Sequence, residues 1–371
     1  MSASGTARRV VITTTVRSAQ AGQIGGYLRV LDLERGRVSF VAPIPDSLYR
    51  HVDPNPRGGL RGGRGIAAHG DRLVIGNAER MFVFDPAWKL TDDITHPLMA
   101  NIHELHADER GLWVTATGCD ALLLIGWDGR LQDFWSFRDN EQLVEELGFP
   151  RSSPPLDPTQ DYRDPRIRGR THTIHINAVS PASKGLLVSF GRMHGFFEPD
   201  GGESVIVRLM DDAPRLAAAA ASIIDRRPAP GMPNHNAAEE GDLLILNDSN
   251  RGVLVAHDWQ RGEERAAVLI PGDPSFARGL ARLGPSLWLV GSQAPLAVYA
   301  VDLDRAEVVA EYPLGGVERE TVFALCPLPD AFEDPSHPGG DDPHAFWRRA
   351  APGKGMTPIP SRGGRITPGR A

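Results

Sequence analysis

Three histidines and two arginines recur at one position of a repeated sequence unit. The units open with Arg64, His103, His175, His235 and Arg278. Three neutral imidazoles suit a divalent first-row metal ion such as iron, zinc or manganese. Arginines on either side of them suit bidentate hydrogen bonds to a carboxylate, phosphate or sulfate. The pattern therefore predicts a metal-assisted site for a small anionic molecule.

Each of these residues begins a unit of similar organisation. A short strand leads into a turn that contains glycine, then a second apolar strand, a loop and a third apolar strand, as in 103–125 and 235–256. The runs are too short and too rich in valine, isoleucine, leucine and tryptophan for helices. Units begin roughly 40 to 70 residues apart, which suits a four-stranded propeller blade. Leading strands line the channel of a propeller, so the five residues are expected to converge there.

The two ends of the chain supply a sixth blade. Strand-like runs at 10–15, 27–33 and 38–41 have no leading strand, whereas 321–328 is a leading strand with no followers. Joining them removes two exposed sheet edges. We therefore expect an all-β fold, a six-bladed β-propeller over residues 1–332, in which N- and C-terminal strands close one blade.

The sixth blade has a carboxylate where the others have histidine or arginine. Glu320 precedes the closing strand, and we predict it to be the fourth metal ligand or the general base. Arg64 and Arg278 are predicted to orient the substrate and to act in catalysis. In the order of the blades, Glu320 lies across the channel from His175.

Other polar residues are candidates for the same site. If the alignment of the units slips by one residue, Asn177 and Asn236 line the channel and contact the substrate. His106 would share this lining, although the three-residue spacing from His103 sends the two side chains to opposite faces of a strand. His194 belongs to a loop near one mouth and is a further substrate-binding candidate.

Two segments depart from the repeat. Residues 133–171 begin with an expected helix at 139–147, followed by a loop rich in proline, aspartate and arginine. An insertion of this length is typical of a lid, here over one channel mouth. Residues 333–371 are rich in proline, glycine, histidine and arginine and are expected to form a mostly disordered tail.

The composition excludes several classes of partner. A net charge of -7 and a pI near 6.0 argue against a nucleic-acid surface, which needs a net basic face. No run approaches the ~18 apolar residues that cross a bilayer, and no signal-peptide core follows the first arginines. We expect a cytoplasmic monomer or homo-oligomer that binds neither membranes nor nucleic acid. Cys119 and Cys326 are expected to be buried free thiols.

Several leading-strand phrases resemble a bacterial family of propeller proteins with no assigned function. They are Ile102-His103, His175-Ile-Asn177, Met232-Pro-Asn-His235 and the run from Phe276 to Ala281. The likeness extends to about Pro329. That family is similar in general architecture to gluconolactonases and strictosidine-synthase-like proteins, so the resemblance implies a propeller fold.

The same resemblance implies two kinds of chemistry. The gluconolactonase-like group implies a metal-dependent hydrolase or lactonase with one divalent ion in the channel. Its metal is held mainly by carboxylate and asparagine side chains, whereas this sequence offers histidines. The phrase His175-Ile-Asn177 is also similar to one in arylsulfate sulfotransferases, propellers whose histidine and arginine accept and hold a sulfuryl group.

Three functional hypotheses follow. The first is a metal-dependent small-molecule enzyme, a hydrolase, lyase or isomerase that acts on an anionic substrate in the channel. The second is a sulfuryl or phosphoryl transferase in which one channel histidine is the nucleophile. The third is a non-catalytic binding or scaffold propeller, because a wet channel is polar without any chemistry and a fold does not specify a function. In that case Arg278 and Arg64 would simply pair with Glu320.

Overall fold

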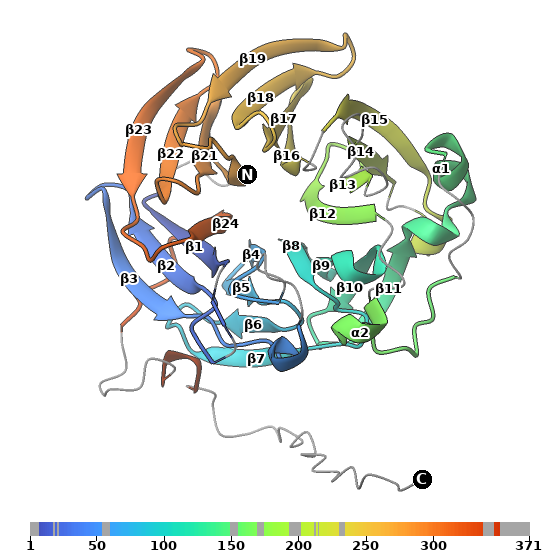
Figure 1. Cartoon of the computed structure of the whole chain (residues 1–371), viewed down its shortest axis with the longest axis horizontal. Coiled ribbons are helices and arrows are strands. Elements are labelled where there is room, and N and C mark those ends of the chain that lie inside the picture. The colour runs from blue at the N-terminus through green and yellow to red at the C-terminus, as the bar shows by residue number, and fades with distance from the viewer. Residues whose placement is uncertain are drawn as a thin grey trace, which may run out of the picture.

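The computed structural model of the 371-residue chain describes residues 7–17, 19–20, 22–53, 60–148, 155–168, 174–192, 202–210, 213, 215–229, 234–336 and 345–348. In this part of the chain, strands form six four-stranded antiparallel sheets, arranged as blades around a central axis (Figure 1). The expected six-bladed β-propeller is confirmed. None of the described helices is long and apolar enough to span a membrane.

The two ends of the chain close the ring in one shared blade, as expected. Its strands, from the axis outward, are β24 (Glu320–Pro327), β1 (Arg9–Val16), β2 (Tyr27–Asp32) and β3 (Arg37–Pro43). β1 pairs with β24 along its length, from Val10 opposite Pro327 to Val16 opposite Glu320. These backbone hydrogen bonds pair β1 on both sides and leave β24 as the inner edge of the sheet, so β1 offers no open edge that would favour aggregation.

The other five blades are each continuous in sequence, and their first strand is the innermost. They consist of β4 (Ile66–His69), β5 (Arg72–Gly76), β6 (Met81–Phe84) and β7 (Leu90–Ile94); β8 (Ile102–Ala107), β9 (Gly111–Ala116), β10 (Ala121–Gly126) and β11 (Leu131–Ser136); β12 (Ile174–Pro181), β13 (Leu186–Arg192), β14 (Glu203–Leu209) and β15 (Ala221–Pro228); β16 (His235–Glu240), β17 (Leu243–Asp248), β18 (Val253–Asp258) and β19 (Glu263–Leu269); and β20 (Arg278–Gly284), β21 (Leu287–Gly291), β22 (Ala297–Asp302) and β23 (Glu307–Pro313).

The core lies between neighbouring blades. Middle strands such as β9 are buried at every position, whereas the outermost strand β23 has no buried position. A blade packed on both faces covers its middle strands twice, which explains their continuous apolar runs. Neither cysteine forms a disulfide bond, as expected; Cys119 is buried, whereas Cys326 is half-buried.

The described residues of the predicted insertion form two short helices and a 3₁₀ turn. Its first residues, 133–136, belong to β11, so the insertion begins at η3 (Phe137–Asp139) rather than at 133. The expected helix is present as α1 (Glu141–Glu146), capped by the Asn140 side chain, which accepts a hydrogen bond from the Leu143 amide at 3.0 Å. α2 (Pro165–Arg168) follows. α1 lies at the rim of the ring (Figure 1).

The predicted lid is described only in part. Residues 149–154 and 169–173 lie outside the described residues, so closure over the mouth stays a prediction. The stretch 155–168 is anchored to the connection between β7 and β8. The Tyr162 amide donates to the Pro97 carbonyl at 2.9 Å, and Arg163 Nη1 donates to Thr95 Oγ1 at 2.9 Å.

Part of the C-terminal segment is docked on the propeller, which composition did not predict. η5 (Ala345–Arg348) carries Phe346 and Trp347, and both side chains are buried. They pack among Phe40 of β3 and Phe82 and Phe84 of β6, with ring centroids 5.0 to 5.5 Å apart. This aromatic cluster ties the segment to two blades. The remaining 3₁₀ turns are η1 (Arg50–Val52), η2 (Thr117–Cys119) and η4 (Leu216–Ala218).

Candidate anion site in the channel

A β-bulge near the start of the innermost strands decides which side chains meet at one level of the channel. In five blades the pairing register skips one residue, at His103–Glu104, Asn177, Asn236, Gly279 and Phe323. Bulges recur beside functional sites, where they re-aim a side chain. The corresponding position in each of these strands is therefore the residue two positions before pairing resumes.

The residues two positions before pairing resumes are His103, Ile176, His235, Arg278 and Val322. The predicted equivalence of His103, His235 and Arg278 is confirmed. His175 lies one residue earlier than this position. The predicted equivalence of Glu320 is wrong, because the bulge at Phe323 puts Val322 there and leaves Glu320 two residues away.

His103 is held in one tautomer by a hydroxyl relay. Its Nδ1 atom lies 2.9 Å from Thr117 Oγ1 and 3.0 Å from the carbonyl oxygen of Asn101. The Thr117 hydroxyl donates its proton to the Ile176 carbonyl of the next blade, so Thr117 Oγ1 accepts from the imidazole. Nδ1 therefore carries the hydrogen, and Nε2 keeps the lone pair.

His235 repeats this arrangement two blades later. Its Nδ1 atom lies 2.7 Å from Ser249 Oγ, and the Ser249 hydroxyl donates to the Ala277 carbonyl at 2.6 Å. Again the hydroxyl is 14 residues after the histidine, as Thr117 is after His103. No residue in the described part of the chain hydrogen-bonds Nε2 of His103 or His235. Both Nε2 atoms are thus proton acceptors.

His175 lies in the same cluster. Its ring centroid is 4.5 Å from that of His103, and the two rings are nearly perpendicular. Burial lowers the pKa of both His103 and His235, and electrostatic repulsion from His175 is among the further causes. The three predicted histidines are therefore brought together, although His175 comes from a different register position.

Phe323 forms an aromatic platform for the two predicted arginines. The guanidinium carbon of Arg278 lies 3.5 Å from its ring centroid, and that of Arg64 lies 4.6 Å away. These are cation–π contacts, which orient a guanidinium without neutralising it. Within the described residues, no group accepts a hydrogen bond from the half-buried Arg278 side chain.

The cluster carries an excess of positive charge. Burial lowers the pKa of Arg278 well below its usual range, and repulsion from Arg17 and Arg64 lowers it further. Burial is also the main cause that lowers the pKa of His103 and His235 well below 6.5, with Arg278 among the repelling charges. The histidines are consequently neutral at pH 7. A bound anion would relieve the repulsion among the arginines.

Glu320 belongs to a different set of contacts. Its carboxylate accepts hydrogen bonds from Arg29 Nη2 at 2.9 Å, from Thr14 Oγ1 at 2.5 Å and from the Val317 amide at 3.1 Å. The side chain is completely buried. The Glu320 carboxylate thus binds groups of its own blade and of the turn before it, and it does not lie among the three histidines.

The residues present do not fit the predicted metal site. In the described part of the chain, no group of three histidine, cysteine or acidic side chains is arranged to hold a metal ion. The nearby guanidinium groups of Arg17, Arg64 and Arg278 would also repel a divalent cation. Metal binding by His103 and its neighbours stays a prediction.

The asparagine candidates have structural partners. Asn177 Nδ2 donates to the Asn234 carbonyl at 2.5 Å, while its Oδ1 atom is buried with no partner among the described residues. Asn236 Oδ1 accepts from the Gly279 amide at 2.9 Å, and its Nδ2 donates to Glu104 Oε2 at 2.6 Å. His194 lies outside the described residues, so its role stays a prediction.

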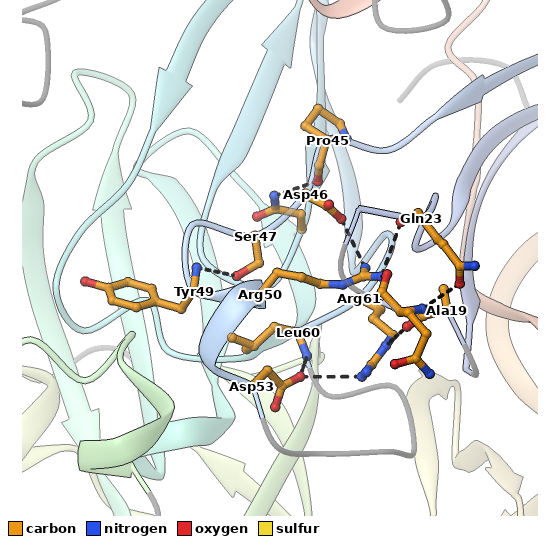
Figure 2. Close-up of polar contacts among 12 residues, drawn as sticks. Ala19, Gln23, Pro45, Asp46, Ser47, Tyr49, Arg50, Asp53, Leu60 and Arg61 are labelled. Atoms are coloured by element: carbon orange, nitrogen blue, oxygen red, sulfur yellow. Dashed lines mark hydrogen bonds and ion pairs between the residues drawn. The ribbon is translucent and has the colours of Figure 1, made fainter. Parts of the chain in front are cut away.

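Two buried arginines support the loops that carry Arg17 and Arg64. Figure 2 shows Arg50 reaching Asp46 at 3.1 Å and the Gln23 carbonyl at 3.2 Å, which ties η1 to the loop after β1. Arg61 Nε donates to the Ala19 carbonyl at 2.5 Å, in the same loop. Such supporting contacts fix the position of a charged group before a ligand arrives.

Sequence reasoning missed several residues of the cluster. Thr117 and Ser249 were detectable, because each follows a candidate histidine by the same 14 positions. Arg17 and Phe323 gave no such signal, since Arg17 comes from a turn and Phe323 from a bulge in a blade without a leading glycine turn.

The comparisons with known proteins bear on the fold alone. The chain matches no known protein family, and no curated protein matches it. Among solved structures, a Bacteroides caccae protein of unknown function has a TM-score of 0.53 at 8% identity, over 87% of this chain and 99% of that one. One in a nidogen/laminin complex has a TM-score of 0.50 at 9% identity, over 86% and 97%.

A candidate 6-phosphogluconolactonase from Bacteroides fragilis has a TM-score of 0.47 at 14% identity, over 86% of this chain and 85% of that one. At these low sequence identities, the similarity to solved structures concerns the fold alone. The expected resemblance to a bacterial protein of unknown function is confirmed at the level of the propeller fold.

Proposed function

We propose that the chain is a small-molecule enzyme that binds an anionic substrate at Arg278 and uses Nε2 of His103 or His235 as a proton acceptor. The observation that carries this proposal is the Arg278 guanidinium, which is stacked on Phe323 at 3.5 Å and lacks an accepting group among the described residues. Burial raises the pKa of the nearby Glu104 to about 8, so this acid is mostly neutral at pH 7, and the half-buried guanidinium charge is costly. A carboxylate, phosphate or sulfate of the substrate would offset that cost.

The state of the histidines supports proton transfer. Nδ1 of His103 and of His235 is occupied by a hydroxyl relay, so each imidazole presents a fixed lone pair toward a ligand. Their lowered pKa keeps them neutral at pH 7. A bound anion beside the arginines would raise that pKa toward the working pH, which makes the imidazole a stronger base once the substrate is present.

This chemistry suits reactions that begin with removal of a proton from a substrate or a water molecule. Elimination, isomerisation and hydrolysis all belong to this class. The substrate's anionic group would be positioned by Arg278 and Arg64 on one side, and its reacting carbon or an activated water would face the imidazoles. Correct placement of the two groups is a large part of catalysis.

A histidine nucleophile is the second candidate for the same atoms. The fixed Nε2 lone pair of His103 beside two guanidinium groups also suits attack on a sulfuryl or phosphoryl group, with the arginines stabilising its oxygens. Covalent labelling by an activated aryl sulfate or aryl phosphate, lost in His103→Asn or His235→Asn, distinguishes this transferase from a proton-abstracting enzyme.

Calorimetric titration with sulfate, phosphate and malonate tests the anion site directly. We expect wild-type protein to bind at least one of them and Arg278→Gln to bind it at least tenfold more weakly. Arg130→Gln is the matched control, because this arginine lies on an outer turn with its side chain 87% exposed. Equal binding by wild type and Arg278→Gln, or no binding by the wild type, overturns the proposal.

A screen of small carboxylate, phosphate and sulfate esters and lactones by mass spectrometry then tests catalysis. Depletion of one compound by the wild type is expected to be lost in His103→Asn or His235→Asn while anion binding persists. Anion binding with no compound consumed would instead support a non-catalytic binding propeller.

A further inference from the structure

A cavity of about 160 Å³ opens into the channel beyond the histidine cluster. All six innermost strands contribute to its wall. On the three strands that carry the histidines, the lining residues follow them: His106 comes three residues after His103, and Ala238 comes three after His235. At ~3.3 Å per residue, the cavity extends roughly 10 Å further along the channel. The channel therefore has a second compartment.

Glu104 places a carboxyl group in the wall of this compartment. Its Oε2 atom accepts from Asn236 Nδ2 at 2.6 Å, and its Oε1 atom accepts from the Leu105 amide at 3.3 Å. No described residue forms an ion pair with it. The Ile66 amide also donates to this carboxyl group, which leaves one of the four lone pairs of the carboxylate beyond these three contacts. Glu104 is thus a half-buried acid that forms no direct ion pair with a described residue, although the charge of Arg278 acts on it.

The rest of the lining is largely aliphatic, with Ile66, Leu105, Leu280 and Leu325 among its residues. A divalent metal ion needs several oxygen ligands, and one carboxyl group does not supply them. An alkylammonium ion suits the compartment better. Its N–H groups would donate to Glu104, and its alkyl chain would contact the aliphatic wall.

We infer that the compartment is a binding site for a small alkylammonium ion, separate from the anion site at Arg278. The chemical class is a primary amine with a short carbon chain. At ~30 Å³ per water molecule, the cavity volume of about 160 Å³ equals about five waters, which is enough for propylammonium.

The charges around Glu104 determine how binding depends on pH. Arg278 of β20 faces it and lowers its pKa, but burial dominates and raises the pKa to about 8. Cys326 of β24 stays a neutral thiol, because burial raises its pKa to about 12. Burial lowers the pKa of His106, so this imidazole is neutral at pH 7. Glu104 consequently gains its negative charge as the pH approaches 8.

Calorimetric titration with propylammonium chloride between pH 6.5 and 9 tests the inference. The amine stays cationic over this range, because its pKa is close to that of lysine, ~10.4. We expect the affinity to rise by up to about tenfold per pH unit below pH 8 and to level off above it. 1-Propanol, which has the same chain without the charge, is expected to bind at least tenfold more weakly.

Glu104→Gln is expected to weaken propylammonium binding at pH 8.5 by at least tenfold, while Glu109→Gln, an exposed neighbour on the following turn, leaves it unchanged. Sulfate, phosphate or malonate should still bind at Arg278 in Glu104→Gln. The experiment therefore distinguishes loss of the amine site from loss of the anion site. Equal affinity of Glu104→Gln and wild type, or equal affinity for 1-propanol, would overturn the inference.

A second measurement distinguishes loss of binding from misfolding of the Glu104→Gln variant. Glu104 is protonated in the folded protein and ionised in the unfolded chain between pH 4.5 and about 8. The wild type therefore loses stability as the pH rises through this window, because the unfolded chain holds fewer protons. Glu104→Gln is expected to lose less, so its urea midpoint at pH 9 should be at least as high as that of the wild type. The urea midpoints of both proteins are compared at pH 5 and pH 9. If the midpoint of Glu104→Gln decreases between these pH values by as much as that of the wild type, Glu104 does not titrate in this range.

Discussion

Arg29 and Glu320 form a buried ion pair inside the blade that joins the two ends of the chain. Arg29 Nη2 lies 2.9 Å from Glu320 Oε2, and the two side chains are 6% and 0% exposed. Arg29 Nε also donates to Oε1 at 3.0 Å. Because Arg29 is on β2 and Glu320 begins β24, the pair fixes the closing strand against its own blade.

Replacing Arg29 with methionine should therefore destabilise the fold without affecting anion binding. The substitution leaves the Glu320 carboxylate buried without its cation, which costs about 3–5 kcal/mol in the free energy of unfolding. Urea denaturation measures this loss. The double variant Arg29→Met/Glu320→Gln should recover part of it, because the unpaired charge is removed.

The control for Arg29→Met is sulfate, phosphate or malonate binding, which is expected to match the wild type. If Glu320→Gln instead abolished anion binding while the urea midpoint stayed at the wild-type value, Glu320 would belong to the channel site after all.

The histidine cluster should make the protein sensitive to acid. His103 and His235 have a folded-state pKa well below 6.5, whereas the unfolded chain binds protons near pH 6.5. Unfolding therefore takes up protons below that pH, and the free energy of unfolding falls as the pH decreases. Each histidine contributes a slope of up to about 1.4 kcal/mol per pH unit.

Urea denaturation between pH 7 and pH 5 checks this slope. His103→Asn should reduce it, since asparagine does not titrate. The exposed His69 supplies the control His69→Asn, which should behave like the wild type. An unchanged slope in His103→Asn would mean that this imidazole is protonated in the folded protein.

Much of the propeller was predictable because each blade repeats a local pattern. Glycine turns and apolar runs fix where blades begin, and the unmatched runs at the ends of the chain predict the shared blade. The same glycine turns aligned His103, His235 and Arg278 correctly. The closing strand has no glycine turn to align, so nothing in the sequence marked where its bulge at Phe323 lies, and the position of Glu320 was misjudged by two residues.

Other features depend on contacts between distant segments. Arg17 approaches Arg278 from a loop that is held by Arg50 and Arg61, and nothing in the local sequence marks this approach. The docked Phe346 and Trp347 lie in a segment of polar composition, which predicts disorder. Their burial depends on aromatic side chains of two blades.

The hydroxyl relays provide a third prediction. Thr117→Val and Ser249→Ala remove the acceptors for Nδ1–H of His103 and His235, so the neutral imidazoles should populate the other tautomer. Nitrogen NMR of labelled histidines reports which ring nitrogen carries the hydrogen. Both variants should lose turnover of any substrate found for the wild type and keep its anion affinity.

Thr117→Ser is the conservative control, because it keeps the hydroxyl and should keep the Nδ1–H tautomer. A wild-type nitrogen spectrum in Thr117→Val would show that the Asn101 carbonyl, 3.0 Å from Nδ1, suffices to hold the ring.

The docked C-terminal segment yields the last prediction. Trp347 is 7% exposed, and its Nε1 atom donates to the Pro43 carbonyl at 2.6 Å. Trp347→Ala should lower the free energy of unfolding by about 3–5 kcal/mol, because it opens a cavity beside Phe82 and Phe84. Trp347→Phe keeps most of the packing and loses the hydrogen bond, so it should cost only about 1 kcal/mol. Urea denaturation separates the two, and a Trp347→Ala protein as stable as the wild type would mean that η5 contributes nothing to holding these blades together.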